Sequence, residues 1–338
     1  MIKAEWFNNR QREDEVLQPD FFKPATHFQI YSEIAKVAFP LRIEVSAFCC
    51  GAVLFRDSYI VENDNKSADY SLCVTDSGFG FTVFADTLKD NPDRIGVKIS
   101  TGESVYEQSI DCEYVTISGK TTDFEGKPFP AAVVFQTHGF NKMGLGVWSG
   151  ADGSYSVVVP KGEYNSIFVD DDSYGKSSLE AWGWKMILDR DETHDFKIGN
   201  GEVYSLDVWA NNGGFPTLFI AFRPMVLDYV LKKETDVTKV NGRTYNMIAT
   251  SPEIALDDVS VWINGSKAEN ISLQKIAETG VDGDIAMPLY ILQIKRMVST
   301  GKQTLILEYD FLDTTGEKAQ GQGRAQFYYT NMHGTSVR

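Results

Sequence analysis

The stretch that decides the fold runs from Gly150 to Gly175 and reads GADGSYSVVVPKGEYNSIFVDDDSYG. Within it, Tyr155, Val157 and Val159 recur with a period of two, so they fall on one face of an extended chain. Asp-Gly and Lys-Gly pairs flank this run, and such pairs supply the positive φ angles of tight hairpin turns. The stretch therefore predicts consecutive β-strands joined by tight turns.

Short alternating runs of the same kind recur along the chain between Gly, Asn, Asp and Pro residues, for example LRIEVSAF, GFTVFA, IGVKIS, YSLDVWA, DVSVWING and QTLILEYDF. This spacing is typical of β-sandwiches. Helical patterns are confined to segments such as YSEIAKVAF and ISLQKIAE, which are too short to form a layer. We therefore expect an all-β chain of three consecutive β-sandwich domains, immunoglobulin-like or transthyretin-like, with very little helix. The expected divisions are 1–113 with a polar N-terminal extension, 114–224, 225–330, and a tail at 331–338.

The charge balance bears on the partners that the chain can have. Its 338 residues carry 32 Lys and Arg against 47 Asp and Glu, which gives a net charge of −15. No run of basic residues forms a patch, so nucleic acid is not an expected partner. An anionic membrane surface is disfavoured by the same repulsion. No stretch approaches the length of about 20 apolar residues that a membrane helix needs, so membrane insertion is not expected either.

The cysteine pattern and the N-terminal sequence bear on the compartment. MIKAEWFNNRQREDEV contains no apolar run followed by small residues, as a signal peptide would. We expect a cytoplasmic protein on this sequence, and a secreted or cell-surface one if a signal peptide was removed. Cys49 and Cys50 are adjacent, and neither Cys73 nor Cys112 completes a C-x-x-C pair. This spacing favours buried free thiols over a disulfide framework or a zinc site.

A set of motifs surrounds the opening stretch. A Gly-Lys-x-Thr-Asp strand, a Gly-Lys-Pro turn and Pro-x-Ala-x-Val precede it, and Asp-Gly-x-Tyr and Gly-x-Tyr hairpins lie within it. The residues concerned are Gly119, Lys120, Thr122, Asp123, Gly126, Lys127, Pro128, Pro130, Ala132, Val134, Asp152, Gly153, Tyr155, Pro160, Gly162 and Tyr164. With these motifs, the region 115–209 resembles the carboxypeptidase regulatory-like family. The resemblance implies a transthyretin-like β-sandwich and a non-catalytic accessory or assembly role, and it carries over no catalytic residue.

The acidic run after this module is a candidate metal site. Asp170 and Asp172, followed by Gly175, resemble the start of a calcium-binding loop, in which alternate carboxylates face one ion. An EF-hand would need ligands where Tyr174 and Ala181 stand, so that type of loop is excluded. A solvated turn is the preferred interpretation, an irregular calcium site is the alternative, and no other cofactor is expected.

Two tryptophans follow the acidic run at strand spacing. If residues 179–188 form one regular strand, Trp182, Trp184, Met186 and Leu188 point to one face. Large side chains that share a face usually form a core, so this pair is expected to pack rather than to bind a ligand. The opposite face carries small residues and could receive another strand or domain closely.

Other tryptophans project from polar faces and are the candidate ligand-binding residues. In YSLDVWA, Trp209 lies on the face of Asp207, and in DVSVWING, Trp262 lies on the face of Asp258. Trp148 alternates with glycines and is expected on an exposed loop. Such a tryptophan beside a carboxylate could stack on a sugar ring or fill an interface between domains.

These observations predict a non-catalytic binding or assembly protein that recognises a carbohydrate or a protein partner. One alternative is a carbohydrate-active enzyme with paired carboxylates, such as those of Asp189, Asp191 and Glu192, in a cleft between domains. Another alternative is a structural scaffold that forms a homo-oligomer through exposed strand edges.

Overall fold

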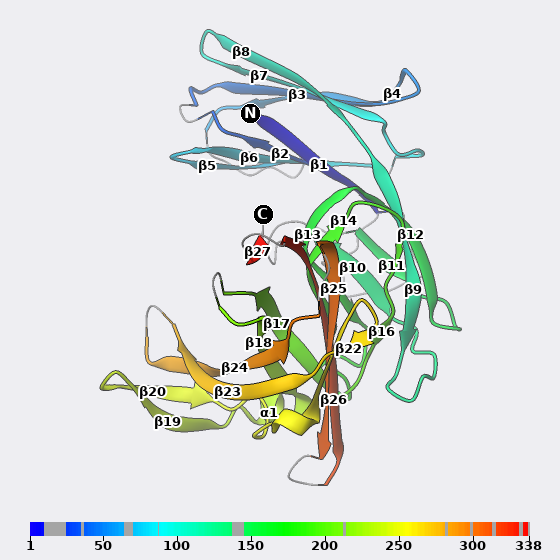
Figure 1. Cartoon of the computed structure of the whole chain (residues 1–338). Coiled ribbons are helices and arrows are strands. Elements are labelled where there is room, and N and C mark those ends of the chain that lie inside the picture. Colours follow the sequence, from blue (N-terminus) through cyan, green and yellow to red (C-terminus); the bar gives the residue numbers. More distant parts are fainter. Residues whose placement is uncertain are drawn as a thin grey trace.

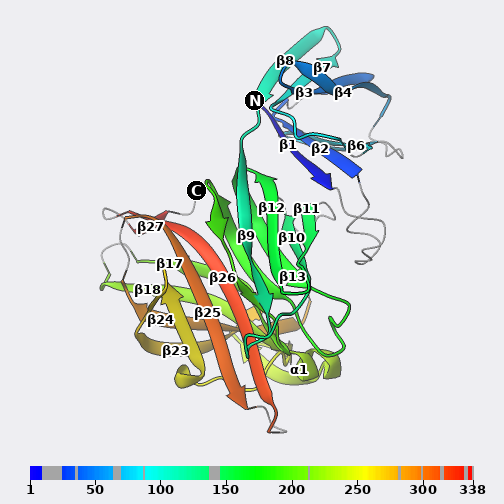
Figure 2. The same cartoon turned by 90° about the vertical axis from the view of Figure 1, so that its right-hand side faces the viewer.

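The structure is a computed structural model of the chain. It describes residues 1–9, 25–34, 37–63, 70–86, 88–136, 145–211, 214–280, 283–297, 300–312, 316–330 and 334–336. The described residues form five β-sheets, and a sandwich made from the N-terminal strands lies at one end of the molecule (Figures 1 and 2). The predicted all-β class and the β-sandwich architecture are confirmed.

The N-terminal sandwich consists of two four-stranded antiparallel sheets. The first contains, in order, β1 (Ile2–Asn9), β2 (Ala25–Ser32), β6 (Gly78–Ala85) and β5 (Tyr70–Thr75). The second contains, in order, β4 (Ala52–Val61), β3 (Leu41–Cys49), β7 (Arg94–Thr101) and β8 (Ser104–Asp111). Alternate residues of both sheets meet in one core that includes Phe28, Ile43 and Phe81. The polar residues between them face outward, as a period of two requires.

The middle sandwich begins with β9 (Tyr114–Thr122), which pairs with β12 (Ser154–Pro160) and with two short strands, β15 (Glu192–Thr193) and β16 (Phe196–Lys197). Its facing sheet contains β11 (Leu145–Trp148), β10 (Ala132–Gln136), β13 (Gly162–Asp170) and β14 (Ala181–Leu188). The predicted common face of Tyr155, Val157 and Val159 is confirmed, since all three pack in the core between these sheets. The Asp-Gly turn has the expected positive φ at Gly153, whereas Gly162 is not among the described residues with positive φ.

The C-terminal strands extend the sheet that contains β11, β10, β13 and β14. Within the described residues it has nine strands, because β14 pairs in parallel with β26 (Lys318–Thr330). Next come β25 (Gly301–Leu312), β21 (Val259–Ile263) and β22 (Ser266–Lys267), while β27 (Gly334–Ser336) pairs with β26. A second sheet faces this one and is made of β17 (Gly201–Trp209), β18 (Thr217–Val226), β24 (Ile285–Lys295), β20 (Arg243–Ile248), β19 (Thr235–Val240) and β23 (Asn270–Thr279).

One sheet therefore spans the predicted second and third domains, and a different core covers each of its faces. The predicted boundary at residue 224 assigns β17 and most of β18 to the second domain. These two strands instead belong to the C-terminal sheet, since β17 pairs with β18 and β18 pairs with β24. Among the described residues the helices are α1 (Leu227–Lys232) and the 3-10 turn η1 (Leu256–Asp258). Neither of these helices is long and apolar enough to cross a membrane.

The tryptophan pair is buried, as predicted, but its strand is not regular. Trp182 and Trp184 lie in the core between the two C-terminal sheets, whereas Met186 and Leu188 lie in the core of the middle sandwich. The expectation that all four share one face is wrong because Lys185 adopts a positive φ of 51°, which interrupts the alternation. Another strand does approach this segment, but it pairs along the edge, where residues 182–184 form a parallel ladder with β26, and does not pack on the small face as predicted.

Candidate functional site

Trp209 lies on the outer side of the six-stranded sheet. Its neighbour Val208 points inward to the core, and the indole stacks on Phe219 of the adjacent strand, with ring centroids 5.6 Å apart and planes 18° apart. Both aromatic side chains are half-buried. The pair thus presents stacked rings on a sheet surface that is not part of the core.

Cross-strand pairing extends this surface over four strands. Trp209 is paired with Phe219, Phe219 with Gln293 and Gln293 with Ser272, and Ser272 Oγ lies 3.2 Å from Gln293 Oε1. Two further cross-strand rows beside this one carry apolar side chains, Ala221 and Ile291 in one row and Leu289 and Ile276 in the other. We call this surface the outer face, and its residues are Asp207, Trp209, Phe219, Ala221, Ser272, Gln274, Ile276, Leu289, Ile291 and Gln293.

Charged pairs stand at two borders of the outer face. Asp207 forms an ion pair with Lys185, and at the other border the buried guanidinium of Arg223 forms an ion pair with Glu278. The Nε atom of Arg223 also donates to the carbonyl of Pro288 at 3.2 Å. The centre of the outer face is therefore apolar, and its borders are charged and locally neutralised.

Trp262 projects from a different surface. It lies on β21 of the nine-stranded sheet, between Val261 and Ile263, which point into the same core as Val208. Because Trp262 and Trp209 point away from that core on opposite sheets, they cannot contact one small ligand together. Lys267 Nζ lies 5.8 Å from the centroid of the Trp262 ring.

Asp258 and Trp148 also differ from the predicted ligand-binding arrangement. The Asp258 carboxylate accepts a hydrogen bond from the backbone N–H of Ala255 at 2.7 Å, so it caps the η1 turn. Trp148 ends β11 and packs half-buried against the core instead of standing on an exposed loop. Its indole Nε1 is buried and has no hydrogen-bond partner among the described residues.

The two predicted calcium ligands have different surroundings. Asp170 is 9% exposed, and burial, reinforced by the negative charge of Asp171, raises its pKa to about 7. Asp172 is exposed, and its backbone carbonyl accepts a hydrogen bond from Lys176 Nζ at 2.8 Å. Within the described part of the chain, neither aspartate belongs to a set of three ligating side chains close enough to hold one ion.

Asp170 belongs instead to a carboxyl cluster with Glu180 and Glu202. Burial is the main cause that raises the pKa of Glu180 to about 9 and that of Glu202 to about 7, and repulsion by Glu202 adds to the shift at Glu180. The backbone N–H of Glu180 donates to Glu202 Oε2 at 3.1 Å. Near neutral pH Glu180 is therefore mainly protonated and Asp170 and Glu202 are about half protonated, so the cluster can donate hydrogen bonds as well as accept them.

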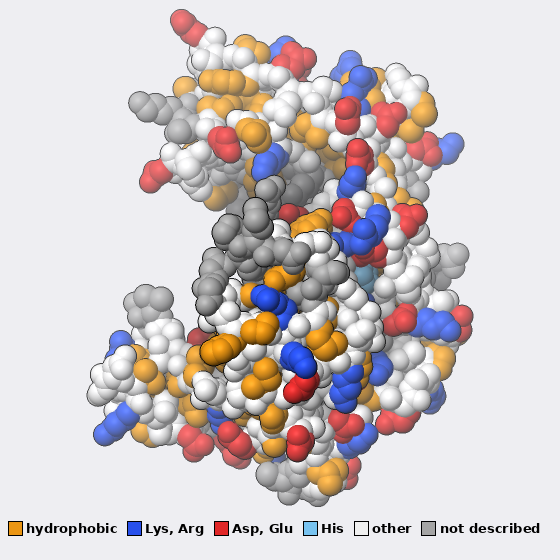
Figure 3. Space-filling view, viewed as in Figure 1, with side chains coloured by type: hydrophobic (Ala, Val, Ile, Leu, Met, Phe, Trp, Pro, Cys, Tyr) orange, Lys and Arg blue, Asp and Glu red, His pale blue; other side chains and the backbone are white. Residues whose placement is uncertain are grey.

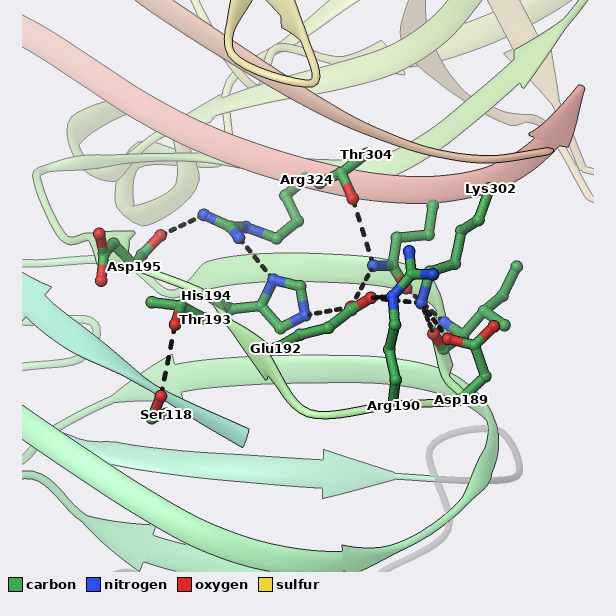
Figure 4. Close-up of polar contacts among 12 residues, drawn as sticks. Ser118, Asp189, Arg190, Glu192, Thr193, His194, Asp195, Lys302, Thr304 and Arg324 are labelled. Atoms are coloured by element: carbon green, nitrogen blue, oxygen red, sulfur yellow. Dashed lines mark hydrogen bonds and ion pairs between the residues drawn. The ribbon is translucent and has the colours of Figure 1, made fainter. Parts of the chain in front are cut away.

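Two of the three acidic residues considered for a glycosidase, Asp189 and Glu192, lie in a separate charged network, which joins the middle sandwich to β25 and β26 (Figure 4). The third, Asp191, instead accepts a hydrogen bond from the backbone N–H of Thr116 at 2.7 Å. Lys302 is 4% exposed at its side chain, lies 2.5 Å from Asp189 Oδ1 and also forms an ion pair with Glu192. Glu192 Oε2 lies 3.2 Å from His194 Nε2 and accepts from Gln326 Nε2 at 2.9 Å. These contacts hold the pKa of Glu192 down to about 2, against the effect of burial.

Lys302 and Arg190 thus balance the charges of Asp189 and Glu192, and both carboxylates contact the same lysine, which differs from an opposed acid and base. Local spacing could not predict the network, because Lys302 lies more than a hundred positions after Glu192. The outer face was missed for another reason. Residues 217–222 read TLFIAF, so both faces of that strand are apolar and alternation alone does not distinguish them.

Acidic and basic side chains are interspersed over the face of the molecule in Figure 3. That face therefore carries no single-sign patch of the kind that binds nucleic acid.

Comparison with known proteins gives little beyond this. No protein-family model matches the chain, and no curated protein matches it. Among solved structures, the pilus 2b backbone protein of group B streptococcus matches with 12% identity and a TM-score of 0.18, over 52% of this chain and 93% of that chain. Both values are too low for any activity or partner to carry over. The resemblance of 115–209 to the carboxypeptidase regulatory-like family and the expected cellular location stay predictions.

Proposed function

We propose that this chain is a non-catalytic binding protein whose outer face docks a protein partner. The observation that carries the proposal is the row-by-row register of Trp209, Phe219, Ile291 and Leu289 on the outward side of a sheet. Outward positions on a sheet that faces water normally carry polar residues. An apolar centre on such a face, surrounded by polar residues, is the usual anatomy of a protein interface.

The borders of the outer face fit the same role. The ion pairs of Asp207 with Lys185 and of Glu278 with Arg223 lie at the rim, where charge contributes to specificity more than to affinity. Trp209 and Phe219 provide the large aromatic surface that most often dominates binding energy. The central strands β18 and β24 are hydrogen-bonded on both sides, and Trp209 on the edge strand β17 stacks on Phe219 of β18, so these residues are held in place before a partner arrives.

A carbohydrate ligand is the second candidate, and one observation favours it. The stacked pair of Trp209 and Phe219 lies beside the side chains of Asp207, Gln293 and Ser272. Aromatic rings with amide, hydroxyl and carboxylate groups nearby can stack on a sugar ring and bond its hydroxyls.

A site-specific photocrosslinking experiment tests the docking proposal. A photoreactive residue replaces Gln274 on the outer face, and a control replaces Glu44 on the outward side of the N-terminal sandwich. We expect one protein adduct from the Gln274 position that is absent from the control. The purified partner should then bind the unmodified chain and lose about 30-fold or more in affinity when Trp209 is changed to alanine.

Two results would count against a protein partner. One is a crosslinked protein that binds Trp209→Ala as tightly as the unmodified chain. The other is a glycan array on which the chain binds one sugar class and Trp209→Ala does not, which would support the carbohydrate candidate instead. The matched control for both experiments is Trp262→Ala, because this half-exposed tryptophan projects from the opposite sheet and is not part of the outer face.

A further inference from the structure

The hairpin between β3 and β4 has an unusual sequence for its geometry. Cys49 pairs with Ala52, and the two residues between them, Cys50 and Gly51, have φ angles of 51° and 83°. Positive φ at both positions defines a type I′ turn, for which Asn-Gly or Asp-Gly is the common choice. A cysteine in the left-handed region is uncommon and costs conformational energy. Its presence at this position calls for a reason other than the turn itself.

The turn brings two thiols together. Cys49 Sγ and Cys50 Sγ lie 3.9 Å apart, much farther than the bond length of about 2.05 Å in a disulfide. The separation instead matches the edge of about 3.8 Å between two sulfurs that bind one tetrahedral zinc ion with Zn–S bonds of about 2.3 Å. Neither thiol is buried, which differs from the sequence-based expectation of buried free cysteines.

Asp93 completes the set from another part of the chain. A carboxylate oxygen of Asp93 and the two Sγ atoms all lie within 4.8 Å of one another. Asp93 is fixed in this position by three hydrogen bonds. Its Oδ2 accepts from the backbone N–H of Cys50 at 2.6 Å, its own N–H donates to Phe48 O at 2.8 Å, and its carbonyl accepts from the N–H of Cys112 at 2.8 Å.

The local charge also favours a cation. The carboxylates of Asp90 and Asp93 both act electrostatically on Cys49. Two arginines at this end of the sheet, Arg56 and Arg94, carry the opposite charge, but their guanidinium groups are held over the ring of Phe48, 5.9 and 4.8 Å from its centroid. Carboxylate and thiolate together form a donor set for a thiophilic divalent ion.

We propose that Cys49, Cys50 and Asp93 form a binding site for a thiophilic divalent cation such as Zn²⁺, with two thiolate ligands and one carboxylate ligand. The exposed turn leaves the fourth position of the tetrahedron to solvent or to a group from outside the chain. Binding replaces two S–H protons by two metal–sulfur bonds, so two protons are released for each ion taken up. The sequence could not show this site, because Asp93 is brought to the cysteines by the pairing of β3 with β7.

The test is a titration of the fully reduced full-length chain with cadmium(II), followed by displacement with zinc(II). We expect an ultraviolet sulfur-to-cadmium charge-transfer band that saturates at one ion per chain and disappears as zinc replaces cadmium. Zinc should also protect two of the four cysteines from a thiol reagent until a chelator is added. Asp93→Asn, whose amide oxygen can still accept from Cys50 N–H, should weaken binding about 10- to 100-fold.

Variants distinguish this site from the other thiols. Cys49→Ser and Cys50→Gly should each abolish the band. Glycine readily adopts the positive φ found at position 50, so Cys50→Gly retains the hairpin. Cys73→Ser removes an exposed thiol on β5 and should leave the band and the stoichiometry unchanged. The proposal is overturned by a band that survives Cys50→Gly, by a band that is lost in Cys73→Ser, or by the absence of any band from the reduced chain.

Discussion

Arg324 Nη1 lies 2.8 Å from Nδ1 of His194, and this contact joins β26 to the connection that runs along β9. A guanidinium group can only donate hydrogen bonds, so His194 accepts at Nδ1 and its ring proton is on Nε2, 3.2 Å from Glu192 Oε2. Burial lowers the pKa of His194, which agrees with a neutral ring. This contact between the middle sandwich and the C-terminal strands therefore requires one tautomer of a buried histidine.

Lys302→Met is expected to destabilise the chain by about 3–5 kcal/mol, because it leaves Asp189 and Glu192 without their buried counter-charge. The measurement is the free energy of unfolding in urea. The control is Lys318→Met, which breaks an ion pair whose two side chains are 53% and 50% exposed and should cost about 1 kcal/mol or less. Equal effects of the two substitutions would show that the network contributes no more than a surface ion pair.

Glu202 is expected to make stability fall as the pH rises. Its folded pKa of about 7 is raised from 4.5, so its contribution is complete below pH 4.5 and is lost as the pH passes through about 7. Glu202→Gln removes this dependence, so its stability relative to the unmodified chain should increase by up to about 3 kcal/mol between pH 5 and pH 8. Urea unfolding at both pH values measures the change.

Glu192→Gln is the control for the pH experiment. Burial opposes ionisation of Glu192, but the hydrogen bonds from His194, Lys302 and Gln326 hold its pKa down to about 2, below the ordinary 4.5. Its contribution is therefore present above pH 4.5 and is lost only as the pH falls towards 2. The difference between Glu192→Gln and the unmodified chain should stay constant from pH 5 to pH 8. A constant difference for Glu202→Gln as well would mean that Glu202 is ionised throughout this range.

Trp184→Ala is expected to cost about 3–5 kcal/mol, because it leaves a cavity in the core between the two C-terminal sheets. The ring stacks on Trp182 with centroids 4.5 Å apart, and its Nε1 donates to Val203 O at 3.2 Å. Trp262→Ala, on the outward side of the nine-stranded sheet, should cost about 1 kcal/mol or less. Thermal or urea unfolding of the two variants compares them. Similar losses would contradict the different burial of the two tryptophans.

Alternation with a period of two predicted the strands, and it predicted that Trp209 and Trp262 face away from the core. That prediction succeeds where the strand is regular, because the pleat alone then decides which way a side chain points. It fails after Lys185, where a positive φ moves Met186 and Leu188 to the opposite core. Nothing about a lysine in a strand sequence indicates such a bulge.

The rest of the fold depends on contacts between distant segments. The parallel pairing of residues 182–184 with 323–325 extends one sheet across two predicted domains, and no local pattern at either segment specifies the other. The same holds for the candidate sites. The outer face needs the pairing of β18 with β24, and the cation site needs Asp93 beside a hairpin more than forty residues earlier in the chain. Sequence alone could therefore predict individual site residues such as Trp209, but not the residues from distant strands that surround them.

Gly119→Ala is expected to destabilise the chain by about 3 kcal/mol, since a Cβ at this position would lie 2.1 Å from the backbone carbonyl oxygen of His194. That carbonyl also accepts a hydrogen bond from the buried hydroxyl of Tyr155 at 2.6 Å, so it cannot move away from the added Cβ without breaking this bond. Gly162→Ala is the matched control, because no heavy atom lies within 4 Å of the added Cβ and the φ angle there is not positive. The control should be neutral or stabilising by up to about 1 kcal/mol, owing to the lower entropy of the unfolded chain. Unfolding in urea compares the two, and a tolerated Gly119→Ala would show that the 192–195 connection is not packed tightly against β9.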